Sequence, residues 1–221
     1  MADTKLTDLT AATDTTGAVV YGVQAGTDKQ FAASLFGGGG SFDFQFAGAG
    51  EYILPTLFFG FSNGTIVPSD NLIQFYPCIG SLTVDAISVE VTTAATGNAR
   101  MGIYSAGADG LPDELLASSA EIDTSTTGIK DGALGSDYAL PSKFWLAAVS
   151  TGGATFRSFA YTTIFGATFV GQDNLGSSYF PIGYCDASFT YGALPADTSA
   201  LTITRRQVNY GNRRAIGLRV A

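Results

Sequence analysis

The stretch Val84-Asp85-Ala86-Ile87-Ser88-Val89-Glu90-Val91-Thr92 decides the fold class of this chain. Its larger apolar residues alternate with polar or small ones over most of its length, which places Ile87, Val89 and Val91 on one face. A period of two is that of a β-strand with one buried face. The stretch therefore predicts a strand in a sheet that packs on a hydrophobic core.

Further strand-like stretches follow one another from residue 71 to the end of the chain. Residues 144–149, FWLAAV, form a nearly continuous apolar run, typical of a sandwich strand buried on both faces. The other predicted strands are residues 71–77, which a proline ends, 99–105, 115–122, 156–165, 167–170, 187–191, 201–204 and 215–220. About eight to ten short strands separated by Gly, Asp, Asn and Pro turns predict an all-β, jelly-roll-like β-sandwich.

Length and composition bound the domain organisation. Of the 221 residues, 46% are hydrophobic, only 14% are charged and 28 are glycines. So low a charged fraction is typical of proteins that bury much of their surface in subunit contacts. The length fits one large domain with a small appendage. We expect a small segment at 1–40 that ends in four glycines, an aromatic connecting segment at 41–70, and the sandwich at 71–221.

Residues 41–70 carry a concentration of aromatic side chains, and SFDFQF at 41–46 alternates with a period of two. A monomer rarely exposes so large an apolar patch. Two interpretations stand side by side: these rings cap the core of the sandwich, or they contact neighbouring copies about a threefold axis. The predicted oligomer contacts are Phe42, Phe44, Phe46, Phe58 and Phe59.

The charge distribution limits the partners. A net charge of −8 argues against a nucleic-acid partner. Five of the eleven basic residues nevertheless lie in the last seventeen positions, namely Arg205, Arg206, Arg213, Arg214 and Arg219. They form either a patch facing an anionic partner, such as lipopolysaccharide phosphate, or pairs with carboxylates on adjacent strands or across a trimer interface.

Location and redox state follow from what the sequence lacks. No apolar run approaches the roughly 20 residues that cross a membrane, so we expect no membrane insertion. The N-terminus lacks the basic and apolar regions of a signal peptide, which predicts assembly in a cytoplasm. Cys78 and Cys185 are 107 positions apart and form either two buried thiols, as a cytoplasm favours, or one bridge between strands.

The sequence gives little support to catalysis. It has no histidine, hence no His-containing triad, and it has no GxSxG or phosphate-binding motif. The carboxylates that a glycan-cleaving enzyme would pair lie in no recognisable arrangement: Glu51, Glu90, Glu114 and Glu121. We predict no enzyme activity, no cofactor and no metal site. Two acidic groups are either solvated or alternative calcium ligands: Asp109, Asp113 and Glu114 in one turn, or Asp123, Asp131 and Asp137 in a long loop.

Aromatic and amide side chains are frequent in the last third of the chain. Flat rings next to hydrogen-bonding groups are the side chains that bind sugars. The ordinary alternative is that the tyrosines lie at the edges of the sandwich. The candidate glycan contacts are Tyr179, Tyr184, Tyr191, Tyr210, Asn174 and Asn212.

The first 36 residues contain two short strand-like runs, at 18–23 and 29–31, around a turn, then a single-turn helix candidate at 32–36. Such a unit is too small to fold alone and is expected to dock on a partner. The runs KLTDLTAAT at 5–13 and VVYGVQAGTDKQFAASL at 19–35 resemble the N-terminal attachment segment of fibre and spike proteins of tailed bacteriophages. Gly22 departs from the larger β-former usual there. The resemblance implies attachment to other virion proteins through Leu6, Leu9, Val19, Val20, Tyr21, Val23, Phe31 and Leu35.

A second resemblance lies within the predicted sandwich. The runs RMGIYSAGADGLPDELLASS at 100–119 and LPSKFWLAAVS at 140–150 are similar to a strand-turn-strand pattern of jelly-roll tips of phage fibres and of carbohydrate-binding β-sandwiches. Together the resemblances imply a homotrimeric tail fibre or spike subunit of a virion that binds a host polysaccharide or lipopolysaccharide. The alternatives are a head-decoration or head-spike protein and a carbohydrate-binding module.

Overall fold

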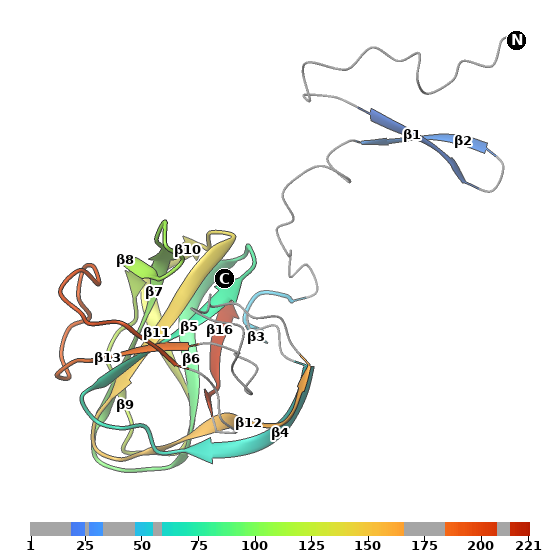
Figure 1. Ribbon diagram of the computed structural model, residues 1–221. Helices are drawn as coiled ribbons and strands as arrows, with labels where there is room; N and C mark the ends of the chain where they lie inside the picture. The colour runs from blue at the N-terminus through green and yellow to red at the C-terminus, as the bar shows by residue number, and fades with distance from the viewer. Residues whose placement is uncertain (1–18, 25–26, 33–46, 55–58, 166–183, 207–212) are drawn as a thin grey trace, which may run out of the picture. The chain divides into compact units, whose positions relative to one another are not determined.

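The computed structural model describes residues 19–24, 27–32, 47–54, 59–165, 184–206 and 213–221. Contacts within the chain divide it into two units, Met1–Ser41 and Phe42–Ala221. In the described residues the regular elements are all β-strands, and no helix occurs. The predicted all-β class is therefore confirmed (Figure 1).

The N-terminal unit contains an antiparallel hairpin. Strand β1 (Val19–Gln24) pairs with β2 (Thr27–Ala32), with Val19 opposite Ala32 and Gln24 opposite Thr27. Gly22 keeps its place in this register opposite Lys29. The predicted helix candidate at 32–36 lies outside the described residues except for Ala32, which belongs to β2. An isolated two-stranded hairpin is at best marginally stable in water.

The larger unit is a sandwich of two antiparallel sheets. Sheet I consists of β4 (Phe59–Ile66), β12 (Thr155–Phe165), β6 (Thr83–Thr93) and β10 (Gly128–Ala139), with β15 (Arg213–Arg214), β16 (Ile216–Val220) and β3 (Tyr52–Ile53) added. Sheet II consists of β5 (Leu72–Ile79), β11 (Lys143–Ser150), β7 (Asn98–Ala106) and β8 (Pro112–Ser118), with β13 (Tyr184–Ser188), β14 (Thr204–Arg206) and β9 (Ile122–Asp123) added.

The strand order is that of a jelly roll. The order β4-β12-β6-β10 in sheet I faces β5-β11-β7-β8 in sheet II. Between β4 and β12 the chain passes from one sheet to the other at β4–β5, β5–β6, β6–β7, β9–β10, β10–β11 and β11–β12. Two four-stranded sheets interleaved in this way form the double-sheet jelly-roll arrangement. The predicted jelly-roll-like sandwich is confirmed. Strands β3 and β4, from the predicted connecting segment, belong to sheet I.

Strand β6 shows how the sequence pattern becomes a buried face. Ile87, Val89 and Val91 are at most 3% exposed and lie in the core between the sheets, as predicted. Val84 joins the same core although strict alternation would place it on the opposite face. The register shifts between Val84 and Ala86 against β16, so a bulge at Asp85 returns Val84 to the core side.

Sheet II is buried on both faces. On β11, Phe144, Leu146 and Ala148 lie in the core between the sheets, whereas Trp145, Ala147 and Val149 lie in a second core. This second core is closed by partly buried side chains of two kinds. Leu111 precedes β8 and Leu115 lies on it, whereas the others follow β13, namely Phe189, Tyr191, Leu194, Leu201 and Ile203. The prediction that residues 144–149 are buried on both faces is confirmed, and residues 189–203 are the reason.

Several predicted strand boundaries were wrong. Strand β5 continues through Pro77 to Ile79. A proline is tolerated there because β13 pairs with β5 only over Leu72–Phe75, so this edge is open at Pro77 among the described residues. Residues 128–139 form β10 although no strand was predicted, because most of its side chains are exposed and its pattern is polar. Of residues 201–204 only Thr204 is in a strand, and residues 167–170 lie outside the described residues.

The two cysteines are free thiols. Both are buried, Cys78 in the core between the sheets and Cys185 in the second core. Sheet II separates them, which excludes a bridge in this fold. Burial raises the pKa of both thiols, that of Cys185 to about 11, so both are protonated and unreactive at neutral pH.

Candidate functional site

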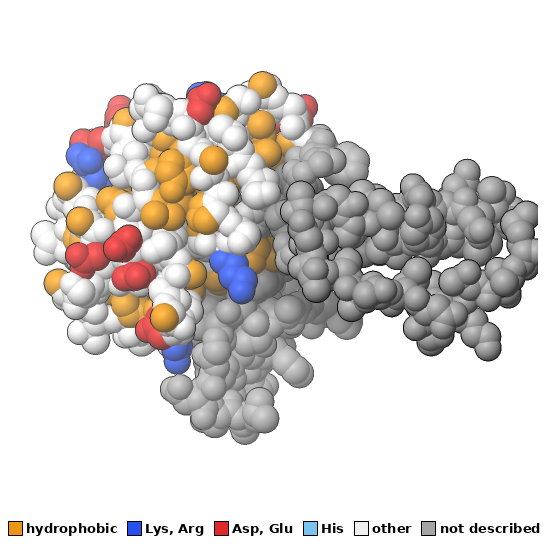
Figure 2. Space-filling model, turned by 90° about the horizontal axis from the view of Figure 1, so that it is seen from above, with side chains coloured by type: hydrophobic (Ala, Val, Ile, Leu, Met, Phe, Trp, Pro, Cys, Tyr) orange, Lys and Arg blue, Asp and Glu red, His pale blue; other side chains and the backbone are white. Residues whose placement is uncertain are grey.

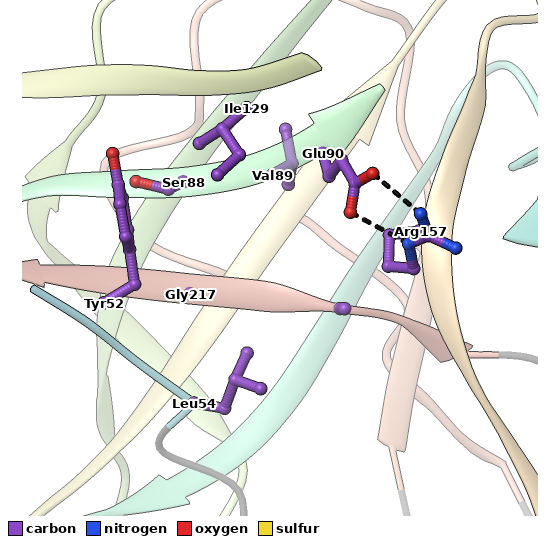
Figure 3. A pocket seen from close by; sticks show the side chains of 9 residues that line it. Tyr52, Leu54, Ser88, Val89, Glu90, Ile129, Arg157 and Gly217 are labelled. Carbon is purple, nitrogen blue, oxygen red and sulfur yellow. Dashed lines mark hydrogen bonds and ion pairs between the residues drawn. The ribbon is translucent and has the colours of Figure 1, made fainter. Parts of the chain in front are cut away.

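A groove of about 430 Å³ lies on the face of sheet I that points away from the core. This volume is in the range of small-ligand sites. Figure 3 shows side chains of β3, β6, β10 and β12 around one space, with Gly217 of β16 between them. It is lined by Tyr52, Leu54, Ser88, Val89, Glu90, Ile129, Arg157, Ala215 and Gly217, and we call it the sheet I groove.

The strand register builds the groove. Opposite residues of an antiparallel pair share a face, and Ile129 on β10 lies opposite Glu90 on β6. On the other side of β6, Gly217 on β16 lies opposite Ser88. Gly217 and Ser88 leave the floor low because neither has a large side chain. A Cβ at Gly217 would approach other atoms no closer than 3.4 Å, so the floor has room for one.

Exposed apolar side chains form the walls of the groove. Tyr52 is 46% exposed, Leu54 45% and Ile129 59%. They are three of the four large hydrophobic side chains that are exposed among the described residues, the fourth being Val67. Apolar side chains that cluster around a hollow, instead of being scattered singly, indicate a binding surface.

An ion pair closes one end of the groove. The guanidinium of Arg157 donates two hydrogen bonds to the Glu90 carboxylate, at 2.8 Å from Nε and 2.7 Å from Nη2 (Figure 3). This contact lowers the pKa of Glu90 and raises that of Arg157, so both stay charged at neutral pH. The pair has no net charge, and each partner keeps further hydrogen-bonding capacity toward the groove.

A second charged network supports the Tyr52 wall. Arg219 on β16 donates two hydrogen bonds of 2.8 Å to Asp85 and one of 2.7 Å to Asp131 on β10. The hydroxyl of Tyr52 donates to the same Asp131 carboxylate at 3.1 Å, and Ser88 donates to its other oxygen at 2.7 Å. The network ties β3, β6, β10 and β16 together and holds the Tyr52 ring upright at the edge of the groove.

This network predicts acid sensitivity. Hydrogen bonds from arginine lower the pKa of both Asp85 and Glu90 in the folded protein. A carboxylate with a lowered folded pKa stabilises the fold above its unfolded pKa, and this contribution is lost as the pH falls through the folded value. We expect the free energy of unfolding to fall between pH 5 and pH 3, with a smaller fall in Arg219→Met. Urea denaturation at each pH measures the free energy of unfolding. Lys143 is an exposed lysine on β11, and Lys143→Met is expected to keep the wild-type dependence of this free energy on pH.

Among the described residues, the predicted glycan contacts do not lie together in one place. Tyr184 stacks on Tyr76, with ring centroids 6.2 Å apart, and packs against the core between the sheets. Tyr191 packs against the second core, and its hydroxyl donates to Glu121 at 2.9 Å. The two rings therefore belong to different sides of sheet II. The remaining predicted contacts, Tyr179, Tyr210, Asn174 and Asn212, lie outside the described residues.

The predicted attachment and oligomer residues are only partly placed. Val19, Val20, Tyr21 and Val23 lie on β1 and Phe31 on β2, with Val20 opposite Phe31. Leu6, Leu9 and Leu35 lie outside the described residues. Phe59 lies on β4 opposite Phe165 of β12. The other predicted oligomer contacts, Phe42, Phe44, Phe46 and Phe58, lie outside the described residues, so their roles stay predictions.

The C-terminal arginines follow the pairing hypothesis in part. Arg206 donates to Asp186 at 2.8 Å, and Arg219 binds Asp85 and Asp131. Arg214 is buried. Figure 2 shows basic and acidic side chains spread around the hydrophobic ones on one face of the sandwich, without a broad basic area there.

Three of the acidic residues considered as calcium ligands have local hydrogen-bond partners. Asp109 accepts a hydrogen bond from the Leu111 amide, and Asp123 accepts one from the Ser125 amide. Asp131 belongs to the Arg219 network. Asp131 and Asp137 lie on β10, so the expectation of a long loop there was wrong. Among the described residues no cluster of three metal-binding side chains occurs.

Most of the groove is not apparent in the sequence. Tyr52 and Leu54 fall in the predicted aromatic connecting segment, and Glu90 is one of four carboxylates without a recognisable arrangement. The available signal was Gly217 in the middle of a strand-like run, because a glycine in a strand marks a bare floor or a close approach. Which residues surround that floor depends on pairing between segments up to 165 positions apart, which periodicity does not encode.

Comparisons with known proteins leave the site to be interpreted on its chemistry. A scan against protein-family models and a search of curated proteins both find no match to this chain. No helix in the described part of the chain has the length and hydrophobicity to cross a membrane.

Proposed function

We propose that this protein is a non-enzymatic virion protein of a tailed phage, a homotrimeric tail fibre or spike subunit whose sheet I groove binds a neutral glycan of the host surface. The observation that carries the binding site is one groove with the exposed Tyr52 ring at one end and the charge-neutral Glu90–Arg157 pair at the other (Figure 3). A flat ring stacks on the apolar face of a sugar, while the ion pair offers donors and acceptors to hydroxyl groups. A pair without net charge favours uncharged saccharides over phosphates.

Two further observations support the appendage role. The N-terminal hairpin belongs to a separate unit, as an attachment segment would, and residues 5–35 resemble such segments. The jelly-roll-like sandwich is the kind of domain that the second resemblance implies for a tip. Three copies on one particle would present three grooves, so that weak single-site binding still holds the particle.

Glycan binding is tested with soluble neutral oligosaccharides on an array, followed by calorimetric titration of the strongest ligand. We expect Tyr52→Ala to weaken binding about tenfold or more, equivalent to roughly 1.4 kcal/mol. Gly217→Val should also weaken it by raising the groove floor. Val67→Ala, an exposed apolar residue outside the groove, is the matched control and should bind like wild type. Unchanged binding in both groove variants would place the site elsewhere.

The oligomer and the place on the particle are tested separately. Light scattering of the full-length protein should give about 68 kDa, three times the 22.8 kDa chain. A monomer would contradict the fibre proposal and favour a carbohydrate-binding module. Labelling on particles distinguishes a tail appendage, which is present in threes or sixes, from a head-decoration protein, which repeats over the capsid lattice.

A further inference from the structure

Arg214 on β15 is a buried arginine without a carboxylate partner among the described residues. Its side chain is only 3% exposed. One donor, Nη2, lies 3.1 Å from the Ser150 hydroxyl, and the guanidinium carbon lies 4.7 Å from the centre of the Phe156 ring, which belongs to the core. The guanidinium therefore lies over a core aromatic ring.

Unsatisfied polar atoms converge on this arginine. In the described part of the chain, three buried side-chain polar atoms lack a hydrogen-bond partner: Arg214 Nε, Arg214 Nη1 and Ser158 Oγ. Ser158 is the cross-strand partner of Arg214 on β12 and is fully buried. Opposite residues of an antiparallel pair share a face, so the three atoms belong to one place in the fold. Buried polar groups are otherwise almost always paired, so three orphans in one place indicate a missing ligand.

Because Arg214 is positively charged, the missing ligand is expected to be an anion and not water alone. Burial lowers the pKa of the Arg214 guanidinium, but arginine stays protonated in proteins. A buried charge without a counter-charge is strongly destabilising. Other arginines of the sandwich avoid this: Arg100, Arg157, Arg206 and Arg219 each lie within 2.8 Å of a carboxylate. A water molecule would satisfy the hydrogen bonds of Arg214 and leave its charge unbalanced.

We propose that Arg214 and Ser158 form an internal binding site for one small monovalent anion, a halide or a small carboxylate such as acetate. Arg214 Nε and Nη1 and the Ser158 hydroxyl would donate to it, and a single negative charge balances the single guanidinium. The ligand must be small because the site lies within the packed sandwich. The anion would act as a structural ion that links β12 to β15.

The test measures thermal unfolding of the full-length protein in sodium chloride, bromide or acetate at constant ionic strength, with sodium sulfate as the balancing salt. An anion bound only by the folded state raises the melting temperature as its concentration rises. We expect a rise of roughly 5–10 °C between a concentration near the dissociation constant and one a hundredfold higher. Bromide in crystals should give an anomalous peak within hydrogen-bonding distance of Arg214 Nε and Ser158 Oγ, and this readout needs no variant.

Variants separate the site from general salt effects. Arg214→Met keeps an unbranched side chain over Phe156 but removes the charge, and should abolish the anion dependence. Ser158→Ala removes one donor and should raise the apparent dissociation constant several-fold. Arg100→Met, which breaks an ion pair at the surface, is the matched control and should keep the full dependence.

One result would overturn the proposal. It is a wild-type melting temperature that is the same in chloride, bromide, acetate and sulfate, together with no bromide peak at Arg214. That result would mean that no exchangeable anion balances the Arg214 charge.

Discussion

Gly152→Ala is expected to destabilise the sandwich by about 2–4 kcal/mol. Gly152 has φ +87°, a conformation that strains an alanine, and a Cβ there would lie 2.0 Å from the Thr96 carbonyl oxygen and 2.7 Å from the Gly97 Cα. Both atoms belong to the backbone, so the two loops must separate. Between them, the Thr151 amide donates to the Asn98 carbonyl at 2.9 Å, and this bond is the first expected to be lost.

The matched control for this change is the next residue. Gly153 also has a positive φ, +74°, but a Cβ there would meet nothing within 4 Å. Gly153→Ala should therefore show only the backbone strain, about 1–2 kcal/mol. Urea denaturation of both variants gives the difference. Equal losses of stability in the two variants would mean that the two loops move apart at little cost in free energy.

The same loop positions the groove, which gives this prediction a functional consequence. Two positions after Gly153, Thr155 pairs with Thr93, and Phe156 then pairs with Val91. This pairing brings Arg157 beside Glu90. We expect Gly152→Ala to weaken glycan binding as well, even at temperatures where the protein is folded, and calorimetric titration with the ligand chosen on wild type measures it.

Trp145→Ala is expected to destabilise the sandwich by about 3–5 kcal/mol. Trp145 is 2% exposed and lies in the second core with Phe75 and Tyr104, whose rings meet edge to face at 5.3 Å. The hydroxyl of Tyr104 donates a hydrogen bond of 2.8 Å to the Pro195 carbonyl. This bond helps to hold residues 189–203 against the second core. Removing the indole would leave a cavity under that segment.

Chemical denaturation measures the loss, and Val67→Ala is the control. Val67 is 57% exposed, so its truncation should change the free energy of unfolding by no more than about 0.5 kcal/mol. A small loss in Trp145→Ala would mean that residues 189–203 cover sheet II without contributing to folding. Limited proteolysis between residues 189 and 203 should then be equally fast in the variant and in wild type.

The fold was predictable where burial leaves a strong pattern. The alternation of Ile87, Val89 and Val91 and the apolar run at 144–149 both correspond to strands with the predicted buried faces. Residues 128–139 gave no such signal, because a strand with mostly exposed side chains can be nearly as polar as a loop. Proline at position 77 indicated a strand end, but the open edge of β5 there tolerates it.

The sheet I groove was not predictable from the sequence pattern. Its tyrosine is Tyr52, which is not among the six residues named from the last third of the chain, and a glycan role for those six stays a prediction. Of those six, the two that the structure describes lie on opposite sides of sheet II. Tyr52 becomes part of a site because Arg219 pairs with it across strands 167 positions apart in sequence.

The sequence by itself determined the all-β class, the hairpin near the N-terminus and the two-sided burial of residues 144–149, because each of these depends on the period and polarity of neighbouring residues. The tertiary structure alone decided the groove, the second core and the buried Arg214 beside Ser158. Each of those depends on long-range strand pairing. This pairing brings together side chains that are far apart in the sequence, and the residues next to each of them do not indicate which partner it will meet. Local periodicity sets which face of a strand is buried, and the strand order sets what that face meets.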